Sequence, residues 1–91
     1  MKHAIEHNPA EHRFEYTEDD LLSFLSYDRQ GDILVLTHTE VPKALGGRGI
    51  AGDLVRAALG SARTEGLKVR AVCSYAAAFM ERHPEFNDLR A

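Results

Sequence analysis

A cluster of glycines divides this chain into two segments whose apolar residues recur with different periods. Four of the seven glycines stand at positions 46, 47, 49 and 52. Before them, residues 32–41 are rich in β-branched side chains and end at Pro42, which predicts a β-strand. After them, apolar residues recur at steps of three and four over residues 49–63, which predicts an α-helix with one buried stripe. A strand joined to a helix through a glycine-rich turn restricts the chain to folds that combine both elements.

The remaining elements are predicted from turn and capping residues. Gly66 is a typical C-cap for the helix, and residues 68–73 form a second β-run. Ser74 is a candidate N-cap for a second helix that ends at His83-Pro84. The amino-terminal third alternates loosely, which predicts short antiparallel strands before a turn at residues 30–32. We expect an α/β or α+β fold with a mixed sheet, whose strand-helix-strand unit is a right-handed crossover.

Length and charge limit the number of domains and the kinds of partner. Ninety-one residues with 44% hydrophobic content are enough for one domain, residues 1–91, and too few for two. The net charge of −3 makes nucleic acid an unfavourable partner, so any anionic ligand must be held locally. The chain has one cysteine, its start lacks a secretory signal, and its apolar runs are far shorter than the roughly 20 residues that cross a bilayer. We therefore expect a cytoplasmic protein with no membrane span.

The glycine cluster has the properties of an anion site. Glycines let the backbone approach a ligand, and the first N–H groups of a helix lack intrahelical partners. The helix dipole and Arg48 add positive charge at the same place. The alternative is a tight turn with close helix-strand packing. Neither common nucleotide motif fits, because no Gly-Lys-Ser or Gly-Lys-Thr is present, and residues 42–46 separate the strand from the spacing that resembles a dinucleotide fingerprint.

The residues around the cluster resemble the cofactor loop of GNAT N-acetyltransferases. Val41-Pro42 precedes Leu45-Gly46-Gly47-Arg48-Gly49-Ile50-Ala51, and Cys73-Ser74-Tyr75 and Pro84-Glu85-Phe86 follow further along. The pattern of that family is Gln or Arg, two residues, Gly, any residue, then Gly or Ala. This chain departs from it at Gly46, which stands in the Gln or Arg position.

The resemblance to GNAT proteins implies a fold, a cofactor and the residues that bind it. It implies a mostly antiparallel sheet whose two central strands, here residues 32–41 and 68–73, splay apart around pantetheine. It also implies acetyl-CoA as the cofactor, with its pyrophosphate bound by the backbone of the loop. The residues implied in binding it are Val41, Leu45, Gly46, Gly47, Arg48, Gly49, Ile50 and Ala51.

Two residues near the end of the first predicted strand are candidates for the catalytic base. Side chains alternate along a strand, so we expect His38 and Glu40 to share a face with Leu34 and Leu36, about 7 Å apart. Either side chain could accept a proton from an attacking ammonium. The alternative is that both are half-exposed polar residues that hydrogen-bond to each other.

Two residues near the start of the second predicted helix are further catalytic candidates. A helix N-terminus favours the thiolate, which makes Cys73 a possible nucleophile, although free cysteine often only fills space in the interior. Tyr75 could act as an acid toward the CoA sulfur, or be a packed aromatic residue with its hydroxyl at the surface. The other histidines show no metal-ligand spacing, so we expect no metal.

Two functions remain open at this stage. The first is an N-acetyltransferase that binds acetyl-CoA and transfers the acetyl group directly to an amine of an unidentified acceptor, either a small molecule or a protein. The second is a non-catalytic CoA-binding or protein-interaction module that keeps the loop without turnover.

Overall fold

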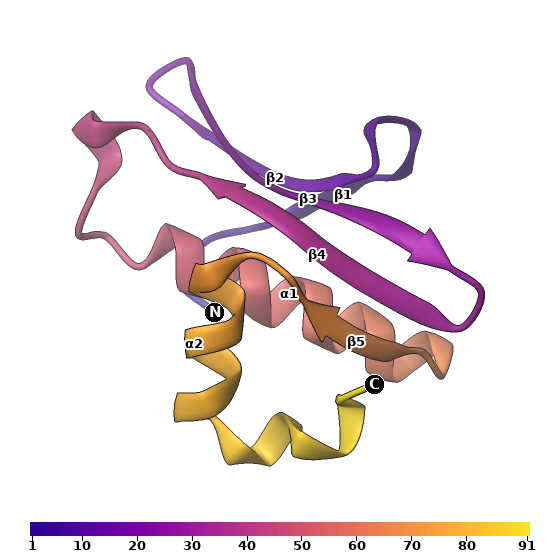
Figure 1. The fold of residues 1–91 in the computed structure, drawn as a ribbon. Helices are drawn as coiled ribbons and strands as arrows, with labels where there is room; N and C mark the ends of the chain where they lie inside the picture. The colour runs from indigo at the N-terminus through magenta and orange to yellow at the C-terminus, as the bar shows by residue number, and fades with distance from the viewer.

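The computed structural model describes residues 1–91 as one five-stranded sheet with two α-helices and three short 3-10 helices (Figure 1). The strands are β1 (Glu6–Asn8), β2 (Arg13–Glu18), β3 (Leu21–Gln30), β4 (Ile33–Glu40) and β5 (Lys68–Ala71). The α-helices are α1 (Ile50–Glu65) and α2 (Ser74–Arg82). The 3-10 helices η1 (Pro9–Glu11) and η2 (Lys43–Leu45) precede α1, and η3 (Pro84–Leu89) follows α2. The strand order follows the sequence, and only the β4–β5 pair is parallel. The prediction of a mixed, mostly antiparallel sheet is confirmed.

Three details of the prediction are wrong. The third strand is long rather than short, because β3 continues for ten residues up to the turn at Gly31. The N-cap of α2 is Cys73, and Ser74 is the first helical residue with no capping bond from its side chain. Strand β5 lies at the edge of the sheet rather than in its centre, since only β4 pairs with it as a full strand.

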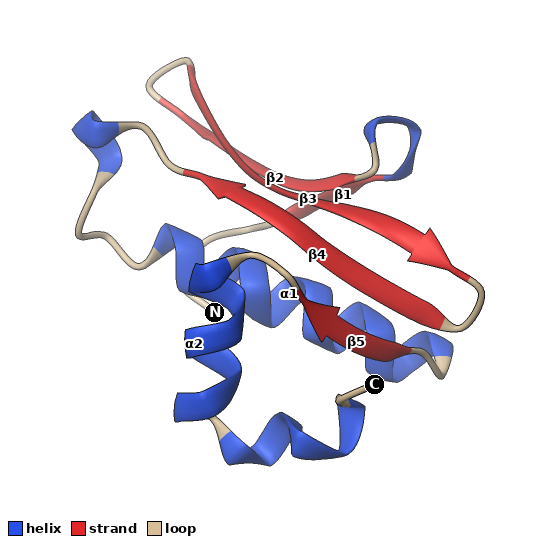
Figure 2. Ribbon diagram, in the orientation of Figure 1, coloured by secondary structure: helices blue, strands red, loops and turns tan.

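The core lies between α1 and one face of the sheet. Leu54, Val55 and Leu59 on the helix are fully buried, and they belong to the same cluster as Phe14 and Leu25 from the sheet. Burying an aliphatic side chain of this kind contributes roughly 1.5–3 kcal/mol, so this stripe holds α1 on the sheet. The opposite face of the sheet carries no α-helix (Figure 2).

Strand β4 contains one extra residue relative to β3. Tyr27 pairs with Leu36, whereas Ser26 pairs with His38, so Thr37 has no partner of its own. The Thr37 hydroxyl donates to the Ser26 carbonyl at 3.0 Å, which satisfies polar groups at the irregularity. An extra residue of this kind reverses the alternation of side chains along the strand. Side chains after position 37 therefore face the opposite way from those predicted by simple alternation.

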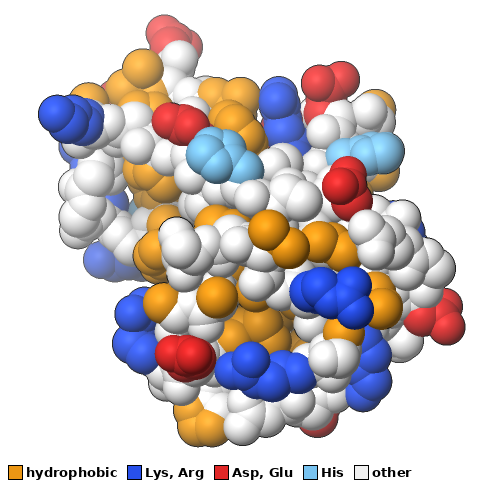
Figure 3. All heavy atoms as spheres, in the orientation of Figure 1, with side chains coloured by type: hydrophobic (Ala, Val, Ile, Leu, Met, Phe, Trp, Pro, Cys, Tyr) orange, Lys and Arg blue, Asp and Glu red, His pale blue; other side chains and the backbone are white.

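The free edge of β5 borders a hollow of about 250 Å³. Figure 3 shows hydrophobic side chains in this hollow and Lys and Arg side chains around it. The Ala91 N–H donates to the Val69 carbonyl at 2.9 Å, so the C-terminal residues cover part of the edge. Leu89 is buried in the core, which shows that the tail packs. Neither α-helix is long and apolar enough to cross a membrane.

Candidate acetyl-CoA site

The glycine-rich loop runs from the end of β4 to the start of α1 (Figure 1). Gly47 and Gly49 have φ angles of +77° and +80°, a region that residues with a side chain rarely adopt. Gly49 is the N-cap of α1, and no side chain accepts a hydrogen bond from the first turn. The N–H groups of that turn have no intrahelical partner and lie at the positive end of the helix dipole. The loop therefore presents backbone donors in an arrangement that suits an anion.

The eight residues predicted to bind the cofactor all line one pocket of about 270 Å³. They are Val41, Leu45, Gly46, Gly47, Arg48, Gly49, Ile50 and Ala51, and the ninth lining residue is Tyr75 from the first turn of α2. Leu45 and Ile50 are buried and anchor the loop at both ends, while the four residues between them are exposed. The fold thus brings one catalytic candidate, Tyr75, to the same pocket as the predicted loop.

Arg48 is the cation within the glycine cluster, and its charge is already paired. Its guanidinium donates to the carboxylate of Glu18 at the end of β2. Glu18 also accepts from the Tyr16 hydroxyl at 2.8 Å. The Tyr16 hydrogen bond, reinforced by Arg48, outweighs burial and holds the pKa of Glu18 below its usual value. Sequence reasoning missed this pair because nothing local links residues 18 and 48.

The first turn of α1 is connected to the N-terminal segment. Asp53 accepts a hydrogen bond from the His3 backbone N–H at 3.0 Å, and its Oδ2 lies 2.7 Å from the His3 Nδ1. Burial by itself raises the pKa of Asp53, but the hydrogen bonds from His3 outweigh it and hold that pKa below the usual value. The His3 ring packs edge-on against Tyr16, with 4.8 Å between ring centroids. A second acidic group missed by sequence reasoning therefore lies beside the loop.

The pairing between β4 and β5 ends at Leu36 and Ala71. The N–H groups of Val72 and Cys73 both donate to the Leu36 carbonyl, at 2.9 and 3.0 Å, and the chain then turns into α2. Strand β4 continues to Glu40 without a neighbour on that side. The two strands thus leave an opening beyond their last pair, as expected, although β5 is an edge strand.

Cys73 lies at this opening and is half-buried. The Thr39 Oγ1 and Cys73 Sγ atoms are 3.2 Å apart. Burial raises the pKa of the Cys73 thiol, but hydrogen bonds from the Thr39 hydroxyl and from the backbone of Ala76 and Tyr75 outweigh it. The pKa of Cys73 is therefore below its usual value, which is the direction expected for a thiol at a helix N-terminus.

His38 and Glu40 do not share a face with Leu34 and Leu36, because the extra residue Thr37 reverses the alternation. Both side chains are more than half exposed, at 58% and 57%, on the face away from α1. The alternative considered from the sequence is present, since the His38 Nε2 and Glu40 Oε1 atoms are 2.8 Å apart. Nowhere in residues 1–91 do three potential metal ligands gather.

The fold and this loop define the class of the protein. A GCN5-like putative N-acetyltransferase from Staphylococcus aureus, solved in solution, superimposes with a TM-score of 0.78 and 27% sequence identity, over 100% of this chain and 91% of that one. The mixed sheet with its two helices is therefore the GCN5-like acetyltransferase fold.

Sequence comparison shows the family. Residues 13–89 match the family model for GCN5-related N-acetyl-transferases, and the chain belongs to that family. Protein NATD1 from Bos taurus and from Homo sapiens is 43% identical over 61 residues, which are 66% of this chain. The matched segment spans about half of those relatives, 54% of their length. Family and fold thus agree on the class of the protein.

Proposed function

We propose that this protein binds acetyl-CoA at the glycine-rich loop and transfers the acetyl group to an amine of an acceptor. The observation that carries the proposal is that all eight loop residues and Tyr75 line one pocket at the start of α1. The site fits a pyrophosphate, because a Cβ built at Gly47 or Gly49 meets no atom within 4 Å and the space over the backbone is open. The free N–H groups from Gly47 to Ala51 would hold the phosphate oxygens.

Tyr75 is the best-placed acid for the departing thiolate. It lines the loop pocket, and its hydroxyl lies 3.4 Å from the position of a Cβ built at Gly52 in the first turn of α1. A phenol in this place can donate its proton to the CoA sulfur as the thioester bond breaks. Cys73 lies two residues earlier, where Thr39 stabilises its thiolate, and it remains a second candidate.

The acceptor amine would approach from the other face of the sheet. Beyond Leu36, β4 has no strand neighbour on the β5 side, so no strand would separate a thioester in the opening from the face away from α1. The hydrogen-bonded pair of His38 and Glu40 lies on the face away from α1 and can take a proton from the incoming ammonium. In this arrangement, the extra residue Thr37 reverses the side-chain alternation, so the base lies on the opposite face of the sheet from α1.

Calorimetric titration of the purified protein with acetyl-CoA, and with NAD as a control, tests the loop assignment. We expect saturable binding of acetyl-CoA and no heat with NAD. Release of CoA in the presence of small primary amines, followed by mass spectrometry of the product, then tests transfer. Absence of acetyl-CoA binding would mean that the glycines form a structural turn only.

The second candidate, a CoA-binding module without turnover, is favoured by one observation. His38 and Glu40 are exposed to solvent, where a base is less well shielded than in a closed active site. Tight acetyl-CoA binding with no CoA release over a broad amine panel would support this candidate.

A further inference from the structure

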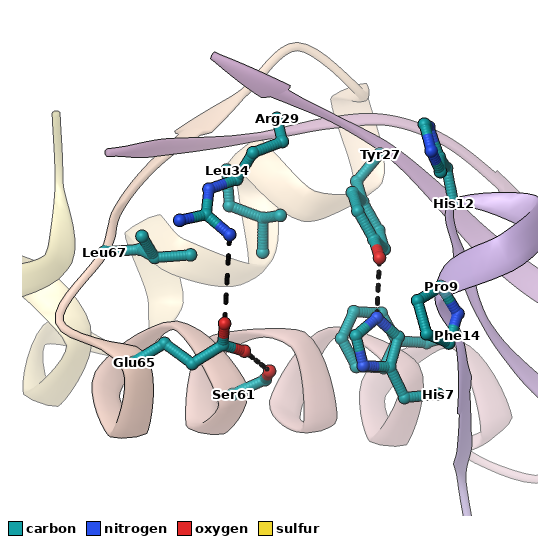
Figure 4. Close-up of a pocket in the computed structure, with 10 residues that line it drawn as sticks. All are labelled: His7, Pro9, His12, Phe14, Tyr27, Arg29, Leu34, Ser61, Glu65 and Leu67. Atoms are coloured by element: carbon teal, nitrogen blue, oxygen red, sulfur yellow. Dashed lines mark hydrogen bonds and ion pairs between the residues drawn. The ribbon is translucent and has the colours of Figure 1, made fainter. Parts of the chain in front are cut away.

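A second pocket, of about 200 Å³, lies at the opposite end of α1 from the glycine-rich loop (Figure 4). The sixteen residues of α1 put its two ends roughly 22 Å apart, so this pocket is separate from the loop. An engineered protein cavity of about 150 Å³ holds benzene, so a ring or a short branched alkyl chain fits here. The lining residues come from the β1–η1 region, the sheet and the last turn of α1.

One side of this pocket is built from aromatic rings. The Tyr27 hydroxyl and the His7 Nε2 are 2.6 Å apart, and the His7 ring stacks on Phe14 with 4.3 Å between centroids. The His12 ring lies nearly parallel to Tyr27, at 5.9 Å. Burial and the nearby charge of Glu65 raise the pKa of Tyr27, so its hydroxyl stays protonated. These four rings line the aromatic side of the cavity.

The other side of the pocket carries a carboxylate, one oxygen of which accepts no hydrogen bond. Glu65 Oε2 accepts from the Ser61 hydroxyl at 2.9 Å. Glu65 Oε1 lies 3.8 Å from the Arg29 Nη1, which is too long for a hydrogen bond. Arg29 instead donates through Nε to the Gly31 carbonyl at 2.8 Å. Figure 4 shows this weak ion pair facing the aromatic rings across the pocket.

We propose that this pocket binds an organic ammonium ion with a small apolar body. The ammonium would donate to Glu65 Oε1 and lie beside the aromatic rings, whose electron-rich faces attract cations. Leu34 and Leu67 supply apolar surface for the body. The negative end of the α1 dipole acts in the same direction, because Glu65 is the last helical residue. An anion would face the carboxylate and the negative end of the dipole, and the charge of Arg29 is already shared with Glu65.

Titration with 3-methylbutylammonium chloride, followed by NMR shifts of the Leu34 and Leu67 methyl groups, tests this site. The neutral isostere 3-methylbutanol is the control, and it should bind at least roughly tenfold more weakly, because it lacks the charge that Glu65 recognises. Equal binding of the alcohol would overturn the proposal, since the pocket would then be only an apolar cavity.

Two variants, each at a half-exposed residue, test whether the pocket prefers a positive or a negative ligand. Glu65→Gln should weaken ammonium binding roughly tenfold, because it removes the anionic acceptor. Arg29→Gln should strengthen it about threefold, because it removes a competing cation. Unchanged affinity in Glu65→Gln, or lost binding in Arg29→Gln, would refute the assignment. Gly49→Val should leave ammonium binding unchanged, which separates this site from the loop.

The ammonium could belong to a free amine or to a lysine side chain of a protein. Titration with Nα-acetyl-lysine N-methylamide distinguishes these sources. Binding at least as tight as that of 3-methylbutylammonium supports a lysine side chain, and binding of the simple amine alone supports a small molecule. If neither probe shifts the two leucine methyl groups at millimolar concentration, the pocket does not bind ammonium ions.

Discussion

The two ends of α1 use the same structural device, a glycine with positive φ, for opposite purposes. At the N-terminal end, Gly49 caps the helix and leaves the first N–H groups without a side-chain acceptor. At the C-terminal end, Gly66 has φ +71° and donates its own N–H toward the carbonyls of Ala62 and Arg63. One end therefore stays open and the other is closed.

This difference determines what each end offers a ligand. The open end exposes backbone donors beside Arg48, which is paired with Glu18. The closed end has few free backbone groups, so its pocket depends on side chains, including Glu65 and the aromatic rings. Helix polarity sets the preferred charge at each end, and the neighbouring side chains decide whether a ligand can use it.

Gly49→Val should produce the largest effect on acetyl-CoA binding, because it blocks the backbone donors at the open end. Valine at φ +80° is strained and brings a branched side chain to the backbone where the pyrophosphate would lie, so acetyl-CoA binding should fall about hundredfold. Calorimetry measures this loss. The matched control is Gly60→Val, in the middle of α1 with open space around it, which should bind normally. Equal affinity in both variants would show that the loop backbone does not hold the cofactor.

Tyr75→Phe should have the second largest effect and distinguishes binding from chemistry at the open end. If the phenol protonates the CoA thiolate, kcat should fall about tenfold, with little change in acetyl-CoA affinity. The expected fall is moderate because a thiolate is already a good leaving group. Steady-state kinetics and calorimetry on the same preparation separate the two. A variant that loses affinity and keeps kcat would make Tyr75 a wall of the pocket rather than an acid.

Asp53→Asn tests how the acidic group beside the open end contributes to stability, through the pH dependence of the unfolding free energy. Because the pKa of Asp53 is lowered in the folded protein, its contribution is present above the usual aspartate pKa and is lost as the pH falls from there through the lowered folded-state pKa. At neutral pH the variant should lose about 1–2 kcal/mol of unfolding free energy, because Asp53 is largely buried and holds His3. Urea unfolding should show this difference shrinking below about pH 4. A difference independent of pH would exclude the proposed linkage.

Glu18→Gln should have the smallest effect and makes the open end more positive. Removing the anion that pairs with Arg48 should strengthen acetyl-CoA binding about threefold, because the pair is partly exposed and screened by solvent. The effect should decrease in high salt. Arg48→Gln should weaken binding by a similar factor. Weaker binding in Glu18→Gln would show instead that Glu18 orients the arginine productively.

The sequence predicted the elements that depend on neighbouring residues. The strand before Pro42, the helix that ends at Gly66 and the loop between them follow from local periodicity and glycine chemistry, and the structure agrees. The roles of the loop residues remain predictions. The face of His38 and Glu40 was predicted wrongly, because the extra residue at Thr37 depends on the register with β3, which no local pattern contains.

The sequence by itself determined the mixed fold and the position of the loop, because apolar period, turn residues and caps act within a few residues along the chain. Only the tertiary structure decided that Glu18 pairs with Arg48, that His3 holds Asp53, and that an aromatic pocket forms at the far end of α1. These contacts join residues that are up to 50 or more positions apart. Their formation depends on how the sheet twists and packs on one helix, which spacing along the chain does not specify.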